Sequence, residues 1–135
     1  MTYRYYEVSL FILRIILGII FLAHGIQKIS NFDEIIKFFE SMGLPGFLPY
    51  FAATVETGGG ILLILGLLTR LAGLGITVLM IGAILTVKLQ AGFIGGYEME
   101  LMYMAAAVAL IFSGSHLYAF DNILQKYWNK SNSDN

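Results

Sequence analysis

The stretch VETGGGILLILGLLT, residues 55–69, decides the fold of this chain. From Thr57 to Thr69, thirteen consecutive residues carry no charge, and Glu56 stands directly before them. Together with the apolar residues that precede it, the segment 48–69 reaches the roughly 20 residues that cross the hydrocarbon core of a bilayer. A carboxylate held at such a depth is energetically costly, so it marks a candidate functional site. The sequence therefore predicts a transmembrane helix that carries Glu56 for a functional reason.

Three further segments, residues 8–27, 71–89 and 98–117, are similar in length and apolar character. The 135 residues are 58% hydrophobic and 13% charged, and the mean hydropathy is +0.77, whereas soluble domains are roughly 45 to 50% apolar and about 25% charged. Because lipid offers no partner to an unpaired backbone amide, each segment must be helical. We therefore expect an all-α fold, an integral membrane antiparallel four-helix bundle over residues 1–124, with a mobile polar tail over residues 125–135.

The connector between the first two spans, residues 29–47, is the longest and the most charged. Asn31 or Asp33 can cap a short helix within it, and Gly43 and Pro45 end that helix. Its apolar and charged residues alternate with helical spacing: Ile35, Ile36, Phe38 and Phe39 against Asp33, Glu34, Lys37 and Glu40. The sequence predicts a short amphipathic helix that lies on the membrane surface.

The other two connectors are short. We expect a tight turn around Thr69 and Arg70, and a loop over residues 90–97, which contain three glycines. Four basic residues fall on the side of the termini and three on the opposite side. By the positive-inside rule, this balance favours cytoplasmic termini in a multi-pass protein of a bacterial plasma membrane.

Composition also excludes several classes of function. The formal net charge is −1 and no basic patch exists, so nucleic acid is not an expected partner. The chain has no cysteine, which excludes disulfides, thiolate metal ligands and dithiol redox chemistry. Any electron transfer must therefore use a bound or partner-supplied cofactor. We predict no metal site, although His24, Glu56 and Glu98 are the residues that could converge as nitrogen and oxygen ligands.

Each predicted span carries small and polar residues on one helical face. These faces hold Arg14, Gly18, Phe21, Gly25 and Lys28 with His24 beside them; Glu56, Gly60, Leu63, Leu67 and Arg70; Gly75, Gly82 and Thr86; and Glu98, Ala105, Ala109 and His116. Small residues allow membrane helices to approach closely, since packing drives helix association in lipid. We therefore expect the four faces to meet in one compact bundle.

A rise of about 1.5 Å per residue sorts the polar groups into two clusters at different depths. An outer cluster, distant from the termini, gathers His24, Lys28, Lys88, Glu98 and Glu100, with Glu56 slightly past the middle of the bilayer toward the termini; an inner cluster gathers Arg14, Arg70, His116 and Asp121. We predict that Glu56 pairs with His24 or Arg14. We further predict that Glu98 or Glu100 pairs with Lys28 or Lys88.

These residues give the candidate site. His24, Glu56 and Arg14 are the candidate catalytic residues, and Lys28, Lys88, Glu98 and Arg70 are the candidate binding residues. A simpler interpretation remains open, because charged residues near helix ends can extend to the interface, and buried ion pairs can serve only to fix helix register.

The run LRIILGIIFLAHGIQK, residues 13–28, resembles the first-helix signature of the DoxX family of small bacterial membrane proteins. The stretch from Gly43 through Glu56 to Arg70 is similar to the second block of that family. The run GGYEMELM, the alanine-rich helix after it and FDNIL resemble the family's end, which maps the acid of its glycine-tyrosine-glutamate motif to Glu98 and its terminal aspartate to Asp121. His116 has no counterpart in the family pattern.

This resemblance implies a four-helix plasma-membrane protein associated with quinone-linked oxidoreductases and with catechol-degradation or thiol-stress operons. The leading hypothesis is a quinone-interacting or redox-associated subunit, with a membrane quinone as cofactor, a redox enzyme as partner and a homo-oligomer as an open alternative. In this hypothesis His24 and Glu56 move protons, while Arg14 or Lys28 stabilises developing negative charge. The alternatives are a non-catalytic membrane scaffold, small-solute carrier or cargo-binding module, and a pathway for ions.

Overall fold

The computed structural model describes residues 2–114 and 119–133, and every regular element in these ranges is helical. The elements in chain order are α1 (Thr2–Ser30), α2 (Phe32–Ser41), α3 (Leu48–Leu65), α4 (Thr69–Ala83), η1 (Ile84–Lys88), η2 (Leu89–Ala91), η3 (Phe93–Tyr97), α5 (Glu98–Ser113) and α6 (Phe120–Ser133). The expected all-α fold is confirmed for the described residues.

Four helical segments of the described chain are long and apolar enough to cross a membrane. They are Arg4–Ser30, Leu48–Leu65, Thr69–Ala91 and Phe93–Ser113. Their outer surfaces carry large exposed apolar side chains, such as Ile12, Ile16 and Ile19 on α1. In water such a surface would be a large unfavourable patch, whereas lipid tails solvate it at no cost. The chain is therefore built to have its apolar exterior in a bilayer.

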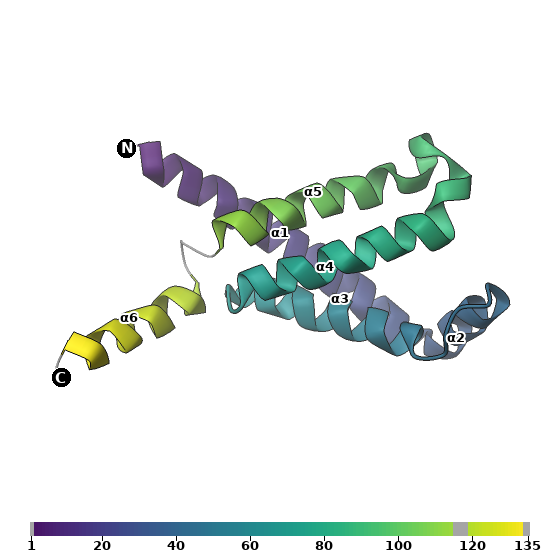
Figure 1. The fold of residues 1–135 in the computed structure, drawn as a ribbon, viewed down its shortest axis with the longest axis horizontal. Helices are drawn as coiled ribbons and strands as arrows, with labels where there is room; N and C mark the ends of the chain where they lie inside the picture. Colours follow the sequence, from purple (N-terminus) through teal and green to yellow (C-terminus); the bar gives the residue numbers. More distant parts are fainter. Residues whose placement is uncertain (1, 115–118, 134–135) are drawn as a thin grey trace.

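Helix contacts place α1 against α3, α3 against α4, and α4 against α5, with a smaller contact between α1 and α5. Figure 1 shows consecutive spans running back and forth, with α2 at the end of the molecule opposite the N-terminus. The core between the spans consists mainly of Leu17, Phe21, Leu63, Ile76 and Leu110, all of them buried. This core separates the two polar regions described below.

Glycines set the close approach of α1 to α3. A Cβ on Gly60 would lie 2.5 Å from the backbone nitrogen of Leu22 and 2.7 Å from the carbonyl oxygen of Gly18. About two turns after Gly18 along α1, a Cβ on Gly25 would lie 2.7 Å from the backbone nitrogen of Thr57. The predicted protein-facing stripe of the first span is confirmed, since Arg14 and Phe21 on the same stripe are also buried.

The predicted face of the fourth span is wrong. Ala105 and Ala109 are exposed, whereas Ala107 and Leu110 are fully buried, so α5 is rotated from the expected orientation. The close approach occurs at Gly73 of α4, where a Cβ would lie 2.9 Å from the carbonyl oxygen of Ala107. A wheel drawn through alanines could not find this face, because α5 contains small residues on several sides.

The turn between α3 and α4 lies three residues before the predicted position. Gly66 has a φ of +67°, and the N–H groups of Gly66 and Leu67 donate to the carbonyl oxygens of Leu63 and Leu62 at 3.2 and 2.9 Å. This Schellman arrangement ends α3, because glycine adopts the left-handed conformation without a steric penalty. Thr69 and Arg70, expected in the turn, belong to the first turn of α4.

The predicted loop over residues 90–97 is only partly irregular. The third span continues as the π-helical turn η1 and the 3₁₀ turn η2, and the chain then turns at Gly92 and Gly95, which have φ values of +79° and +75°. Within η3, Ile94, Gly95 and Gly96 depart from helical backbone angles. Glycines therefore interrupt the helical backbone between the third and fourth spans, as the sequence predicted, but the irregular segment is shorter than residues 90–97.

The segment that the sequence predicted as a polar tail is largely helical in the structure. Figure 1 shows α6 outside the four spans, beyond the ends of α3 and α4. Its first turn is held at that corner, because the Asp121 carboxylate accepts hydrogen bonds from the N–H groups of Leu68 and Thr69 at 2.9 and 3.3 Å. The Asp121 N–H also donates to the Gly66 carbonyl oxygen at 3.1 Å. A residue of α6 thus caps the N-terminus of α4.

Candidate functional site

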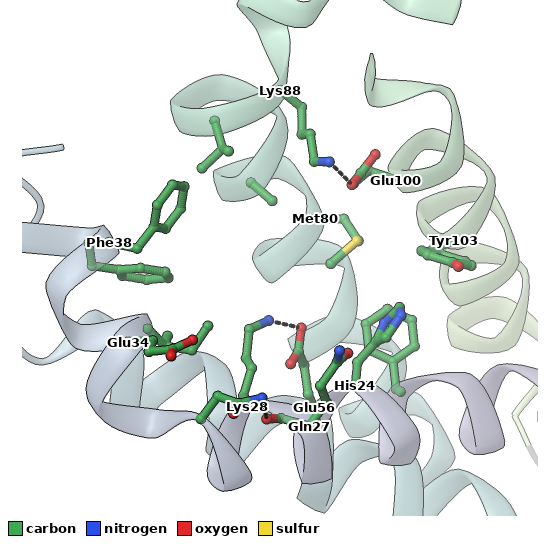
Figure 2. A pocket seen from close by; sticks show the side chains of 16 residues that line it. His24, Gln27, Lys28, Glu34, Phe38, Glu56, Met80, Lys88, Glu100 and Tyr103 are labelled. Atoms are coloured by element: carbon green, nitrogen blue, oxygen red, sulfur yellow. Dashed lines mark hydrogen bonds and ion pairs between the residues drawn. The ribbon is translucent and has the colours of Figure 1, made fainter. Parts of the chain in front are cut away.

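A cavity of about 450 Å³ lies between α1, α2, η1 and α5, with Glu56 of α3 and Met80 and Ala83 of α4 also in its lining (Figure 2). Its volume falls within the range of roughly 300 to 1,000 Å³ that is typical of small-molecule sites. The lining combines charged, aromatic and apolar side chains: Phe21, His24, Gln27, Lys28, Asn31, Glu34, Ile35, Phe38, Phe39, Glu56, Met80, Ala83, Val87, Lys88, Glu100 and Tyr103. We call this space the polar cavity.

The first charged pair of the polar cavity joins α1 to α3. Lys28 Nζ lies 2.6 Å from Glu56 Oε1, and the exposed fractions of the two side chains are 26% and 5%. The close approach at Gly25 and Thr57 brings the two helices together one turn before Lys28 and one residue after Glu56. Glu56 Oε2 is buried and has no hydrogen-bond partner among the described residues. Since buried polar atoms are nearly always satisfied, this oxygen is a natural contact for a ligand or a bound water.

The second charged pair joins the third span to α5. Lys88 Nζ lies 3.6 Å from Glu100 Oε1. Lys88 is the last residue of η1, whose wider π-helical turn changes the direction in which side chains leave the helix. Figure 2 shows this pair across the cavity from Lys28 and Glu56. Glu100 Oε2 also has no hydrogen-bond partner among the described residues.

Aromatic rings form one wall of the polar cavity. The His24 ring lies 6.3 Å from Phe21 and 6.2 Å from Tyr103, and the Phe21 and Tyr103 rings lie 5.4 Å apart, all measured between ring centroids. All three contacts are edge-to-face, which is a favourable geometry for aromatic pairs. The wall therefore places the His24 ring beside the charged groups of the same cavity.

A second, apolar cavity of about 240 Å³ adjoins the first. The two share Lys28, Phe39, Glu56, Met80, Ala83 and Val87, so that the first ion pair lies at their junction. The remaining lining is apolar apart from Thr86: Leu44, Leu48, Phe51, Ala52, Val78, Leu79, Gly82 and Thr86. We call this space the apolar cavity.

The predicted partners of Glu56 are wrong. Glu56 pairs with Lys28, and neither His24 nor Arg14 makes a hydrogen bond to it among the described residues. His24 nevertheless lines the same cavity as Glu56. The second predicted pairing is confirmed in one of its forms, by Lys88 with Glu100.

Arg14 lies outside the polar cavity, at the other end of the bundle. It is 2% exposed, its Nη1 atom lies 2.7 Å from the position of a Cβ on Gly66, and its charge interacts with Asp121. Arg70 is close by in space and lines a surface cavity of about 580 Å³ with Asp121 and Gly114. The structure thus separates Arg14 and Arg70 from His24, Glu56 and Lys28. His116, which we expected in this inner cluster, lies outside the described residues.

Glu98 is placed differently from the expectation. Its side chain accepts a hydrogen bond from the Gly95 N–H at 3.1 Å, on the exposed turn that precedes α5, and it does not line the polar cavity. His24, Glu56 and Glu98 do not gather as metal ligands in the described chain. The sequence interpretation missed Tyr103 and Gln27. The signal was present for Tyr103, which lies one helical turn after Glu100 in an otherwise apolar segment.

The profile of the DoxX family matches residues 9–89, which run from the third turn of α1 through η1 and therefore include both residues of the first ion pair. The chain belongs to the DoxX family. A Bacillus subtilis protein named "Putative oxidoreductase CatD" is 40% identical over 121 residues, which cover 90% of each chain. The Mycobacterium tuberculosis "Uncharacterized membrane protein Rv3486" is 33% identical, over 87% of this chain and 82% of its own.

The Escherichia coli "Inner membrane protein YqjF" is 30% identical, over 90% of this chain and 96% of its own. No solved structure matches this chain. Two of these relatives are named as membrane proteins, and this chain has four helices fit to cross a bilayer among its described residues. It is a multi-pass membrane protein.

Proposed function

We propose that this DoxX-family protein is a quinone-interacting subunit of a redox system in a bacterial plasma membrane. The observation that carries the proposal is the polar cavity, where two ion pairs, a histidine and an aromatic wall meet between helices. Ionisable groups inside membrane bundles commonly serve proton relays or ligands. The relative named as an oxidoreductase agrees with this class of function.

The residues present fit a planar ring with polar oxygens. The edge-to-face wall of Phe21, His24 and Tyr103 offers an apolar surface for a ring. The buried Glu56 Oε2 atom, which has no hydrogen-bond partner among the described residues, offers an acceptor to a ligand hydroxyl. A bound quinone would supply two-electron, two-proton redox chemistry at this place.

The protein groups would act on protons and charge. Glu56 and His24 would exchange protons with a bound oxygen, and Lys28 would stabilise negative charge that develops on it. Lys28 takes this role alone, because Arg14 lies at the other end of the bundle. Lys88 would bind a second polar group, since it lies across the cavity from Lys28 and Glu56 (Figure 2). Since the chain has no cysteine, a partner redox enzyme would deliver the electrons.

The same proposal includes the arrangement in the membrane. We propose an antiparallel bundle over residues 1–124 with cytoplasmic termini, a polar C-terminal segment over residues 125–135, and α2 as an amphipathic helix on the outer membrane surface. Ile35, Phe38 and Phe39 of α2 line the polar cavity together with the exposed Glu34, while Asp33, Lys37 and Glu40 do not line it and are exposed. This division of side chains supports α2 as a cover over the cavity at the bilayer surface. Glu98 and Arg70 would then bind partners outside the cavity.

Binding of decylubiquinol, the reduced form whose hydroxyl groups can donate to Glu56, to the purified protein in detergent tests the proposal. We expect saturable binding that His24→Ala and Glu56→Gln each weaken by about tenfold, which corresponds to about 1.4 kcal/mol. Glu98→Gln is the matched control, because this carboxylate lies outside the polar cavity, and it should leave the affinity unchanged. Thermal unfolding of each variant shows whether the protein remains folded.

Two results would contradict the proposal. Absence of saturable binding to the folded wild-type protein would remove quinones from its function. Unchanged affinity in both cavity variants, with a lowered unfolding temperature in Glu56→Gln, would assign the ion pair to helix register. The second result would favour the alternative function, a non-catalytic scaffold, small-solute carrier or cargo-binding module.

A further inference from the structure

The apolar cavity has no role in the chemistry described above, although it shares its wall with the polar cavity. Six residues line both spaces, and the Lys28–Glu56 ion pair stands at the junction. A molecule seated in the polar cavity can therefore extend past this pair into the apolar cavity. Toward α2 the lining of the polar cavity combines the apolar Ile35 and Phe38 with the exposed polar Gln27, Asn31 and Glu34. These polar groups make that direction less favourable for an aliphatic chain than the apolar cavity.

The apolar cavity is also continuous with the lipid-facing surface. Phe51 of α3 and Val78 of α4 line it and are 42% and 51% exposed. Gly82 lines it too, and a Cβ on Gly82 would have no heavy atom within 4 Å. The cavity is thus an open apolar passage between α3 and α4, from the buried ion pair to the hydrocarbon region.

We infer that the apolar cavity is the passage for the aliphatic tail of the ring ligand, and that Gly82 keeps it open. This inference rests on the proposed function and adds a specificity-determining site to it. The head of the ligand occupies the polar cavity beside Lys28 and Glu56, and the tail leaves between α3 and α4 into lipid. A tail gains little hydrophobic free energy from moving out of lipid into this passage, so the passage acts through steric access.

The test compares a tailed and a tailless ligand with the same kind of head, decylubiquinol and the short ubiquinol analogue that lacks the decyl chain. In the full-length protein in detergent, Gly82→Phe should weaken decylubiquinol binding by at least about tenfold, or about 1.4 kcal/mol. The same variant should leave the affinity for the tailless analogue unchanged. Because each ligand is compared across variants, its partition into micelles cancels.

The matched control is Gly58→Phe. Gly58 also lies in a span, and a Cβ there would likewise have no heavy atom within 4 Å, but it lines a different surface groove with Tyr50 and Thr54. The Gly58→Phe variant should bind both ligands with wild-type affinity. The less bulky variant Gly82→Leu, with the same expected direction, covers the case in which Gly82→Phe does not fold.

The outcomes separate the two proposals. If Gly82→Phe and Gly82→Leu fold and bind the tailed ligand with wild-type affinity, the passage is not the tail route, although the quinone site stands. Equal weakening of both ligands would likewise overturn the inference, since it would show a general disturbance of the head site. If the wild-type protein binds neither ligand, the proposed function itself fails.

Discussion

At the scale of single residues, the three consecutive glycines of α3 have different surroundings. A Cβ on Gly58 would meet nothing within 4 Å, and one on Gly59 would meet Ile76 at an ordinary 3.6 Å. A Cβ on Gly60 would meet backbone atoms of α1 at 2.5 and 2.7 Å. Backbone cannot move aside as the end of a flexible side chain can. Only the third glycine is therefore required for packing.

We expect Gly60→Ala to destabilise the protein by about 1 to 3 kcal/mol, because the added methyl group overpacks the contact between α1 and α3. The measurement is the thermal unfolding midpoint in detergent. Gly58→Ala is the control in the same helix and should be neutral or slightly stabilising, since alanine favours a helix over glycine. Equal midpoints for the two variants would show that the close approach does not limit stability.

The ion pairs show what could be predicted at this scale. The cost of burying a carboxylate identified Glu56, and the helical wheel placed Lys28 on the protein-facing stripe. The predicted partner of Glu56 was wrong, because the depth estimated from the rise per residue placed Glu56 too far toward the termini. The helix crossing fixed at Gly25 and Thr57 brings Glu56 to Lys28, and this crossing depends on packing between segments distant in sequence.

At the scale of elements, helix ends were harder to predict than helices. The spans followed directly from hydropathy, but α3 ends at Leu65, four residues before the expected boundary, because Gly66 adopts a left-handed conformation. Glycine often ends a helix, but this segment contains Gly58, Gly59, Gly60 and Gly66, and the sequence alone does not show which of them adopts the left-handed conformation. The buried face of α5 could not be predicted from the sequence either, because it is set by the packing of Gly73 against Ala107.

The capping of α4 by Asp121 can be tested by mutation. Asp121→Ala removes both oxygens that accept from Leu68 and Thr69 at the start of α4. Loss of such a cap costs about 0.5 to 2 kcal/mol, and the carboxylate also interacts favourably with the positive end of the helix dipole. We expect a lower unfolding midpoint together with faster tryptic cleavage after Lys126 in α6.

Asp121→Asn is the matched control for this prediction. Asparagine retains one acceptor oxygen but loses the negative charge that interacts with Arg14, so its stability and its protection from trypsin should lie between those of the wild type and of Asp121→Ala. Cleavage after Lys126 at the wild-type rate in Asp121→Ala would show that α6 is held by contacts other than this cap.

At the scale of the whole molecule, composition was sufficient to predict a multi-pass helical membrane protein, since no other structure satisfies the backbone of such apolar segments in lipid. The depth of each residue also separated Asp121 from Lys28, but Arg14 was expected near Glu56 and lies at the other end of the bundle. The shapes of the two cavities could not be predicted, because they are the spaces left when all side chains have packed. Their volumes depend on how each helix is rotated about its own axis, and the rotation that the sequence predicted for α5 was wrong.

The absence of cysteine from the chain makes its orientation directly measurable. Ser41 in α2 and Ser133 in α6 are both exposed. With four spans and cytoplasmic termini, a membrane-impermeant maleimide should label Ser41→Cys in intact cells, and should label Ser133→Cys only after permeabilisation. The reverse pattern would place the termini outside, and labelling of both sites in intact cells would contradict the three crossings expected between Ser41 and Ser133.

The contact of α1 with α3 also restricts how the length of this chain can vary. Gly18, Gly25 and Lys28 act together because they share one stripe of α1, facing Gly60, Thr57 and Glu56. Each residue turns the helix by about 100°. A single-residue deletion between Gly18 and Lys28 would swing the lysine away from its carboxylate while the first glycine stayed in place. Insertions and deletions tolerated in descendants of this sequence should therefore fall in the connectors between helices. The spacing of Gly18, Gly25 and Lys28 along α1 should stay constant.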